Sequence, residues 1–250
     1  CVYPAWIDLN GNDKKDPGEE LEDGYNELNI RSVEMKIHGD FAGLYFEEME
    51  LTTLQLNPNS EVTLISTDKL KIFLGGECEQ LKSLFTGKNL EKVDVRKCKG
   101  LKTFQTRSKL TELDLTGCEA LEKLDCYKNE LHTLDLQGLK ALKEVDCYSN
   151  RLTKVQVGDN DSLVKVDLRH NRLDSMNIDG IVKNLPKRAK KDGAIIKLDG
   201  NTAIPSGNDY TSANLKNWKM TPAAGKITFT TSKQAGSTIR LKVTAQETNP

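Results

Sequence analysis

The chain has 250 residues, of which 29% are charged and 6% aromatic, and its formal net charge is −1. This length can bury a sizeable core, and the balanced charge gives no electrostatic basis for binding nucleic acid or an anionic membrane. The sequence has no run of about 18 apolar residues, so it predicts no transmembrane helix, and no signal peptide is visible at its N-terminus.

The segment WIDLNGNDKKDPGEE at 6–20 spaces oxygen-bearing side chains like a calcium-binding loop. With Asp8 in the first place, an EF-hand-type loop takes its side-chain oxygens from Asp8, Asn10, Asn12, Asp16 and Glu19, and a backbone carbonyl from Lys14. Two features depart from that motif, because Asp13 replaces the usual glycine and a β-like segment replaces the preceding helix. The spacing predicts a structural Ca²⁺ site, and the alternative is a turn that hydrogen-bonds only to itself.

The segment NIRSVEMKI at 29–37 alternates apolar and polar residues. This alternation predicts a strand that shields the first repeat. We therefore expect residues 1–48 to form an N-terminal cap of strands and loop.

A 21-residue repeat occupies the centre of the chain. The segments that align without gaps are LEKLDCYKNEL (121–131), LKEVDCYSNRL (142–152) and LVKVDLRHNRL (163–173). Upstream copies begin at residues 62, 81 and 101, and a weak copy, IIKLDGN, follows an insertion at 195–201. One such coil cannot bury its own apolar side, so about seven coils must stack over residues 49–204.

The spacing L-x-x-L-x-L/C-x-x-N-x-L is the leucine-rich repeat pattern. Alternate residues of a strand face opposite sides. We therefore place 121–126, 142–147 and 163–168 on a concave parallel sheet, and the LDL segments 113–115 and 134–136 on the convex side. The expected fold is an α/β-type, mostly β solenoid, a right-handed leucine-rich repeat horseshoe.

A ladder of amides is expected beside the concave sheet. Asn129, Asn150 and Asn171 recur at one position of the repeat. An amide both donates and accepts hydrogen bonds, so we expect these side chains to bond the turning backbone of adjacent coils.

Two columns of residues are expected to face outward from the concave sheet. One column is Phe85, Gln105, Asp125, Asp146 and Asp167, and the next is Gly87, Arg107, Tyr127, Tyr148 and Arg169. The expected ligand-binding residues are all members of these columns except Gly87. Tyrosine brings contact area at little entropic cost, so we expect Tyr127 and Tyr148 to anchor the ligand. The alternative is that the Asp residues keep the strands soluble and the Tyr rings pack on each other.

The five cysteines of the repeats, Cys78, Cys98, Cys118, Cys126 and Cys147, are expected to be buried free thiols. Cys126 and Cys147 share their repeat position with Leu168, and such a position belongs to the core. Adjacent coils are close enough for a disulfide, but in-register side chains point the same way, which suits a bridge poorly. No C-x-x-C occurs and no His lies near a cysteine in the sequence, so zinc and redox sites are not favoured. Cys1 is either a lipid-modified residue or a chain boundary.

The C-terminal region predicts helices and a hairpin. GIVKNLPKRAKKDG at 180–193 predicts a helix, which we place as an insertion at 180–192 with a solvated basic face, and SANLKNW at 212–218 predicts a second one. KITFTTSKQAGSTIRLKV at 226–243 alternates on both sides of a turn and predicts a β-hairpin. We expect residues 205–250 to form a cap whose hairpin docks on 195–218, because apolar alternating strands rarely stay uncovered. The alternative is that the hairpin awaits a following module.

The repeats resemble the cysteine-containing repeats of internalin-type bacterial surface proteins. The insertion, the NLKNW stretch and the hairpin are similar to leucine-rich repeat modules of cell-surface proteins from Bacteroidetes-type anaerobes, in which a loop like WIDLNGNDKKDPGEE often precedes the repeats. Thr86 and Thr106 depart from the pattern at the Cys position. The resemblance implies a bacterial protein that is secreted or on the cell surface, including association with the outer membrane, and that binds host or matrix ligands.

The expected function is a monomeric, non-catalytic binding module for a protein or glycan ligand. The chain lacks G-x-S-x-G, H-E-x-x-H and a phosphate-binding glycine loop. A structural spacer in a larger adhesin is the alternative function, and a surface hydrolase is less favoured.

Overall fold

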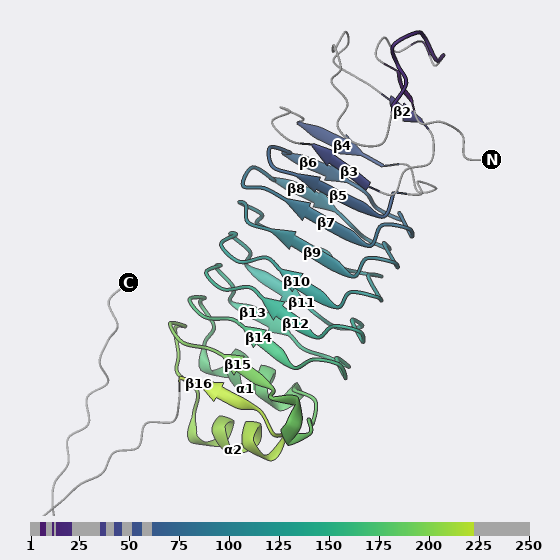
Figure 1. Cartoon of the computed structure of the whole chain (residues 1–250). Helices are drawn as coiled ribbons and strands as arrows, with labels where there is room; N and C mark the ends of the chain where they lie inside the picture. Colours follow the sequence, from purple (N-terminus) through teal and green to yellow (C-terminus); the bar gives the residue numbers. More distant parts are fainter. Residues whose placement is uncertain are drawn as a thin grey trace, which may run out of the picture.

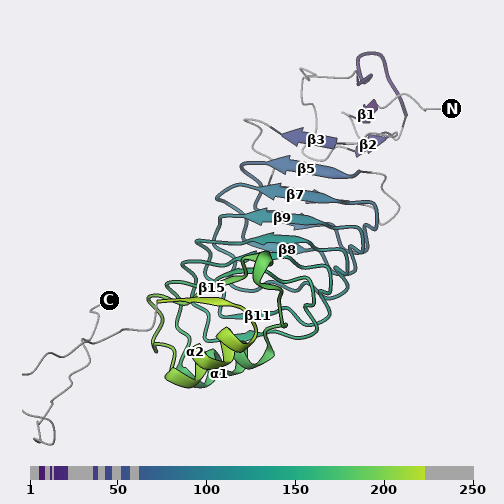
Figure 2. The same ribbon diagram turned by 60° about the horizontal axis from the view of Figure 1, so that its bottom comes forward.

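The computed structural model describes residues 6–8, 12, 14–21, 36–38, 43–46, 52–56 and 62–222 (Figure 1). This part of the chain is a stack of coils built mostly from parallel strands, with helices at its C-terminal end (Figures 1 and 2). The predicted mostly β, solenoid-like architecture is therefore confirmed.

One parallel sheet, which we call the long sheet, runs the length of the stack. Among the described residues it has nine strands, which are β3 (Gly43–Phe46), β5 (Leu64–Thr67), β7 (Ser83–Thr86), β9 (Thr103–Thr106), β10 (Lys123–Asp125), β12 (Glu144–Asp146), β14 (Lys165–Asp167), β15 (Ile195–Lys197) and β16 (Lys219–Thr221). The predicted strands at 121–126, 142–147 and 163–168 contain β10, β12 and β14, in the predicted register. The structure adds β3 and β16 to the coils expected from the sequence.

Shorter parallel sheets lie across the core from the long sheet. One contains β4 (Thr53–Gln55), β6 (Ile72–Leu74) and β8 (Lys92–Asp94), and the other contains β11 (Thr133–Asp135) and β13 (Lys154–Gln156). Of the two LDL segments, 134–136 overlaps β11, whereas 113–115 forms no strand. At the N-terminal end, β1 (Trp6–Asp8) pairs with β2 (Lys36–His38) in antiparallel fashion, and β2 overlaps the strand predicted at 29–37.

The core lies between the sheets because each strand of the long sheet alternates its faces. In β7, Leu84 and Thr86 are buried while Ser83 and Phe85 are half-exposed. The same position is filled in successive coils by side chains that are at most 1% exposed, namely Leu84, Phe104, Leu124, Val145, Val166 and Ile196. Each such side chain contributes about 1.5–3 kcal/mol of hydrophobic burial, and it is buried largely by the coils on either side.

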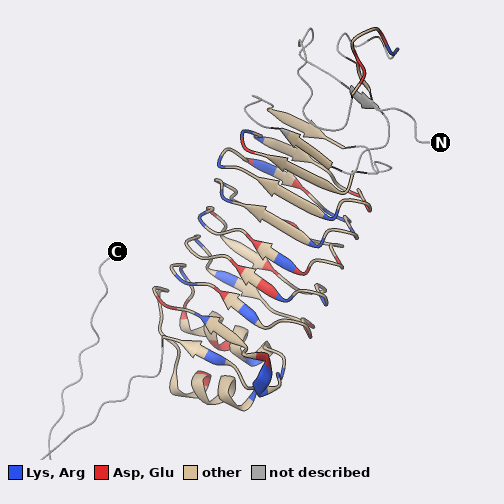
Figure 3. Cartoon of the chain, viewed as in Figure 1, with Lys and Arg blue, Asp and Glu red and all other residues tan. Residues whose placement is uncertain are grey.

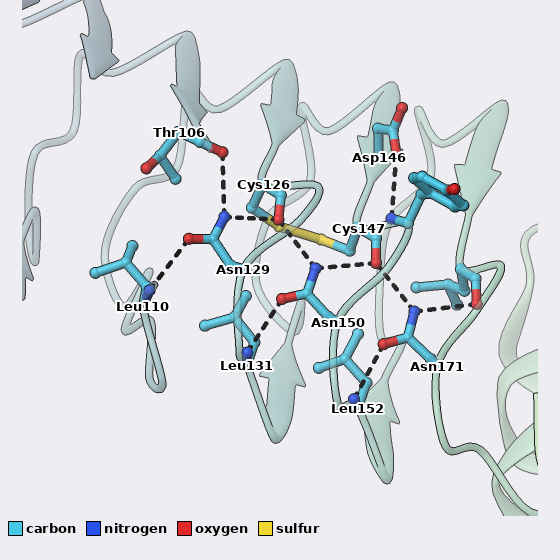
Figure 4. The surroundings of a disulfide bond; sticks show 12 residues. Thr106, Leu110, Cys126, Asn129, Leu131, Asp146, Cys147, Asn150, Leu152 and Asn171 are labelled. Carbon is cyan, nitrogen blue, oxygen red and sulfur yellow. Dashed lines mark hydrogen bonds between the residues drawn. A yellow bond between two sulfur atoms is a disulfide. The ribbon is translucent and has the colours of Figure 1, made fainter. Parts of the chain in front are cut away.

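The predicted asparagine ladder is present (Figure 4). The Asn150 amide donates to the carbonyls of Cys126 and Cys147, at 3.0 and 3.1 Å, and its oxygen accepts from the Leu131 NH. Asn129 and Asn171 make the equivalent bonds in their own coils. Asn201 continues the ladder into the weak copy at 195–201. The ladder therefore pairs buried backbone groups that no strand can reach.

Cys126 and Cys147 form a disulfide, so the expectation of free thiols was wrong for these two (Figure 4). Their Cα atoms, one coil apart, are separated by 5.0 Å, which lies within the range that a disulfide spans. The parallel direction of the side chains does not prevent the bridge. Cys78, Cys98 and Cys118 are buried thiols that form no disulfide, as expected.

The helices at the C-terminal end differ in extent from those predicted. The first, α1 (Ser175–Asn184), begins earlier because the Asp174 side chain caps it by accepting from the Asn177 NH at 2.8 Å. It ends before Pro186, since proline disfavours helix at the preceding residue. A short 3₁₀ helix, η1 (Lys190–Asp192), follows.

The second helix, α2 (Gly207–Leu215), also starts earlier than predicted, at a capping box of Ser206 and Asp209. Trp218 lies outside this helix and is buried, and its indole NH donates to the Pro186 carbonyl at 2.7 Å. Leu215 is 74% exposed. The predicted hairpin at 226–243 lies outside the described residues. No helix in the described ranges has the length and apolar character needed to cross a membrane.

Candidate ligand-binding face

The two predicted columns form adjacent rows on the outward face of the long sheet. Strand pairing places Phe85 beside Gln105, Gln105 beside Asp125, and Asp146 between Asp125 and Asp167. We call Phe85, Gln105, Asp125, Asp146 and Asp167 the carboxylate row, and Gly87, Arg107, Tyr127, Tyr148 and Arg169 the aromatic row. The repeat period of the sequence was therefore sufficient to predict which of these residues are neighbours.

Asp167, at one end of the carboxylate row, is neutralised by two cations. Its carboxylate accepts bonds of 2.7–3.1 Å from Arg169 and lies 3.3 Å from Lys197 Nζ. It is only 5% exposed, so it does not face solvent as the prediction required. Burial alone would raise the pKa of Asp167, but the hydrogen bond from Arg169, aided by Lys197, outweighs that effect and lowers the pKa.

Asp125, in the middle of the row, is in the opposite situation. Its Oδ1 is buried and has no hydrogen-bond partner among the described residues. Burial raises the pKa of Asp125, and the neighbouring carboxylate of Asp146 raises it further. Asp146 accepts a hydrogen bond from the Tyr148 NH at 3.2 Å. The negative charge of the carboxylate row is therefore unfavourable at Asp125 and compensated by cations at Asp167.

The aromatic row is a continuous stack of rings and guanidinium groups. Arg107 lies 4.3 Å above the Tyr127 ring, and Arg169 lies 5.3 Å from the Tyr148 ring. The two tyrosine rings are 6.4 Å apart, and His170 meets Tyr148 edge-on at 5.4 Å. Both tyrosines are half-exposed. Cation–π and ring contacts hold these side chains in place, so their outward surfaces are preorganised for contact.

A hollow of about 500 Å³ opens beside the Arg107 end of the aromatic row. It is lined by Ser66, Thr67, Asp68, Phe85, Thr86, Gly87, Lys88, Asn89, Gln105 and Arg107. At its edge Gly87 lies directly against the neighbouring turn, since a Cβ there would lie 2.0 Å from the Asp68 carbonyl oxygen. The strands around it, β7 and β9, carry no charged residue, in contrast to β10, β12 and β14 (Figure 3).

The described residues among the predicted calcium ligands lie in one short loop at the N-terminal end of the chain. Asp8 and Glu19 are 0% and 3% exposed, respectively. The Asp8 carboxylate accepts from the Asn12 NH at 3.2 Å, and Glu19 accepts from the Asp16 NH at 2.8 Å. The Asn12 amide also donates to Asp16. Lys14 has an exposed side chain and donates its NH to Asn12. Asn10 lies outside the described residues.

Several residues of this face were missed by the sequence reasoning. Lys197 occupies the carboxylate row beside Asp167, and Asp199 follows Arg169 in the aromatic row's register. Continuing the repeat into IIKLDGN would have found both. Asp68, Lys88 and Asn89 lie in turns after the strands, where the repeat pattern carries no signal.

No model of a protein family matches this chain, and no curated protein matches it either.

Proposed function

We propose that the chain is a leucine-rich repeat module, a right-handed horseshoe whose long sheet is the concave side, and that it binds a protein or glycan ligand on that face without catalysis. The resemblance of its repeats to internalin-type proteins supports placing it on the surface of a bacterium or in its secretions. The observation that carries the proposal is the aromatic row, in which two half-exposed tyrosines are held between Arg107 and Arg169.

The aromatic row is suited to ligand recognition because its side chains are already ordered before the ligand binds. Side chains that are already immobilised lose less entropy in a complex. Tyrosine and arginine are also the residues that most often dominate binding energy at interfaces. Alternating Lys and Glu residues flank the carboxylate row, as in the paired positions Lys123, Glu144 and Lys165, and they supply a polar rim.

A screen of the chain against protein and glycan arrays tests the proposal. We expect at least one ligand, and we expect the double variant Tyr127→Ala/Tyr148→Ala to lose it while keeping its melting temperature within a few degrees. The matched control is Thr133→Ala/Lys154→Ala, an exposed and directly paired position on β11 and β13. A ligand that survives the tyrosine substitutions but is lost in the control would overturn the proposal.

A structural spacer is the second candidate, and one observation favours it. Every ring of the aromatic row already has a partner within the chain, so the row can serve packing alone. A spacer predicts no ligand on any array, and a large loss of stability when both tyrosines are replaced.

We also propose that the N-terminal loop holds a structural Ca²⁺ ion. Asp8, Asn12, Asp16 and Glu19 lie in one loop, and two of them are buried carboxylates, whose negative charge a cation would compensate. Calcium would fix the entry to the first coil and stabilise the fold by mass action.

The calcium proposal predicts a higher melting temperature in millimolar Ca²⁺ than in chelator. The difference should disappear in the variant Asp8→Ala. An identical melting temperature of the unsubstituted chain in both buffers would rule the site out.

A further inference from the structure

The hollow beside Arg107 contains two cations, Arg107 and Lys88, that no carboxylate of the described residues holds in an ion pair. Arg107 makes no side-chain hydrogen bond or salt bridge within the described ranges; it lies over the Tyr127 ring, and its charge acts on Asp125 only through space, partly offsetting the rise that burial causes in the pKa of that carboxyl group. Lys88 and Asn89 have no side-chain partner there either. The exposed Asp68 is the one carboxylate that lines the hollow, so two cations face one anion.

The absence of an ion-paired carboxylate for Arg107 is specific to its coil. Elsewhere an arginine two residues after an aspartate is clamped by it, as Arg169 is by Asp167 and Arg96 by Asp94. In the coil of Arg107 the aspartate position of the carboxylate row is occupied by Gln105. A neutral amide cannot take the charge of the guanidinium, so that charge remains available to a ligand.

The other lining groups match the hydroxyls and ring faces of a sugar. Gln105 and Asn89 each offer an amide donor and acceptor, and Ser66 adds a hydroxyl. Phe85 is half-exposed and offers an apolar surface. The volume of about 500 Å³ falls in the usual range for small-molecule sites.

We propose that this hollow binds an acidic saccharide. Arg107 and Lys88 meet the carboxylate or sulfate of the sugar, a guanidinium being well shaped for such an anion. Gln105, Asn89 and Asp68 bond its hydroxyls, and Phe85 lies against the ring. The inference rests on the proposed function and deepens it, because it names the ligand class and shifts the centre of binding from the tyrosines to the Arg107 end of the row.

Titration calorimetry on the full chain with four probes tests the ligand class. The probes are sialyllactose, a sulfated lactose, lactose itself and a short glutamate-rich peptide, all at one ionic strength. We expect one or both acidic sugars to bind at least about tenfold more tightly than lactose or the peptide, as a charged hydrogen bond allows. The two acidic probes distinguish a carboxylated from a sulfated ligand. Equal binding of lactose, equal binding of the peptide, or no binding of any probe would overturn the proposal.

Two substitutions test the residues. Arg107→Gln should lower the affinity for the acidic sugar about tenfold or more. Arg107→Lys, which keeps the charge, should lower that affinity less. Gln105→Asp rebuilds the aspartate–arginine clamp without touching Arg107, so it too should abolish binding. Arg96→Gln, which breaks the clamp outside the long sheet, is the control and should leave binding unchanged. Full binding by the Gln105→Asp variant would contradict the proposal.

Failure of this inference is distinguishable from failure of the proposed function. A protein ligand lost on replacing Tyr127 and Tyr148, with no acidic sugar bound, would refute the hollow as a saccharide site and leave the binding face intact.

Discussion

Identical residues on one row of the long sheet differ in electrostatic state because their neighbours differ. Asp125 and Asp167 hold equivalent positions two coils apart. Asp167 is paired with Arg169 and Lys197, whereas Asp125 has a buried oxygen without a partner among the described residues. The repeat determines where a side chain lies, and the residues of the flanking coils determine whether its charge stabilises or destabilises the fold.

Replacing these two aspartates by asparagine should therefore change stability in opposite directions. At neutral pH, Asp125→Asn should stabilise the fold, because the folded state raises the pKa of Asp125 through burial and the charge of Asp146. Asp167→Asn should destabilise it, because the ion pairs lower the pKa of Asp167. Denaturant unfolding at neutral pH measures both.

The pH dependence follows from the sign of each shift. A raised pKa favours the folded state fully below the unfolded value, about 3.8, and that contribution is lost as the pH rises through the folded pKa. A lowered pKa stabilises the fold above that value and is lost as the pH falls through the folded pKa. In strong acid, the free energy of unfolding of both variants should therefore approach that of the unsubstituted chain. Effects of the same sign at neutral pH would contradict this account.

Left-handed turns recur between the coils, and they are occupied by different residues. Gly117 and Gly138 have φ of 81° and 77°, while the non-glycine residues Lys97 and Ser149 adopt 59° and 57°. A side chain in this conformation costs about 1–2 kcal/mol. At the non-glycine positions, the packing of neighbouring coils offsets this conformational cost.

Alanine at the two glycines should separate backbone strain from crowding. Gly138→Ala should cost about 1–2 kcal/mol, because no atom lies within 4 Å of the added Cβ. Gly117→Ala should cost clearly more, since its Cβ would lie 2.9 Å from the Lys97 Cα. Chemical unfolding of both variants makes the comparison, and equal losses would show that the neighbouring coil yields freely.

At the scale of elements, the strands in the middle of the stack were predictable and those at its ends were not. Leu124, Val145 and Val166 repeat at a constant interval, so the positions of β10, β12 and β14 followed from the period. The sequences GLYF of β3 and KMT of β16 lack that pattern. These strands form because a neighbouring strand offers unpaired backbone groups, which is a property of the stack and not of the segment.

The disulfide was missed for a related reason. The shared direction of the Cys126 and Cys147 side chains predicts free thiols, whereas the 5.0 Å separation of their Cα atoms permits the bond. Cys78, Cys98 and Cys118 behave as predicted, since burial raises the pKa of the Cys78 thiol to about 11 and those of Cys98 and Cys118 to about 12. Such thiols are unreactive at neutral pH.

Reduction of the Cys126–Cys147 bond should destabilise the stack at β10 and β12. The bond closes a loop of 21 residues, and a loop of that size restrains the unfolded chain by about 3 kcal/mol. The urea midpoint should fall in reductant, and peptide mapping by mass spectrometry should recover the linked pair. The variant Cys126→Ser/Cys147→Ser serves as control, since reductant should not affect it. An unchanged midpoint of the unsubstituted chain would count against the bond.

At the scale of the whole molecule, the candidate site exists only because coils stack. Arg107, Tyr127, Tyr148 and Arg169 come from four coils, and no coil alone holds a ring between two cations. The sequence predicted this row because it follows the period. It did not predict the hollow, which is lined in part by the turn residues Asp68, Lys88 and Asn89.

Hydrogen–deuterium exchange of the chain, with and without a ligand identified on the arrays, tests the binding face most directly. We predict slower exchange in peptides covering 105–109, 125–129 and 146–150, which carry the two rows and the turns beside them. Peptides covering β11 and β13, across the core, should exchange at the same rate in both states. Protection confined to β11, β13 or α2 would contradict binding on the long sheet.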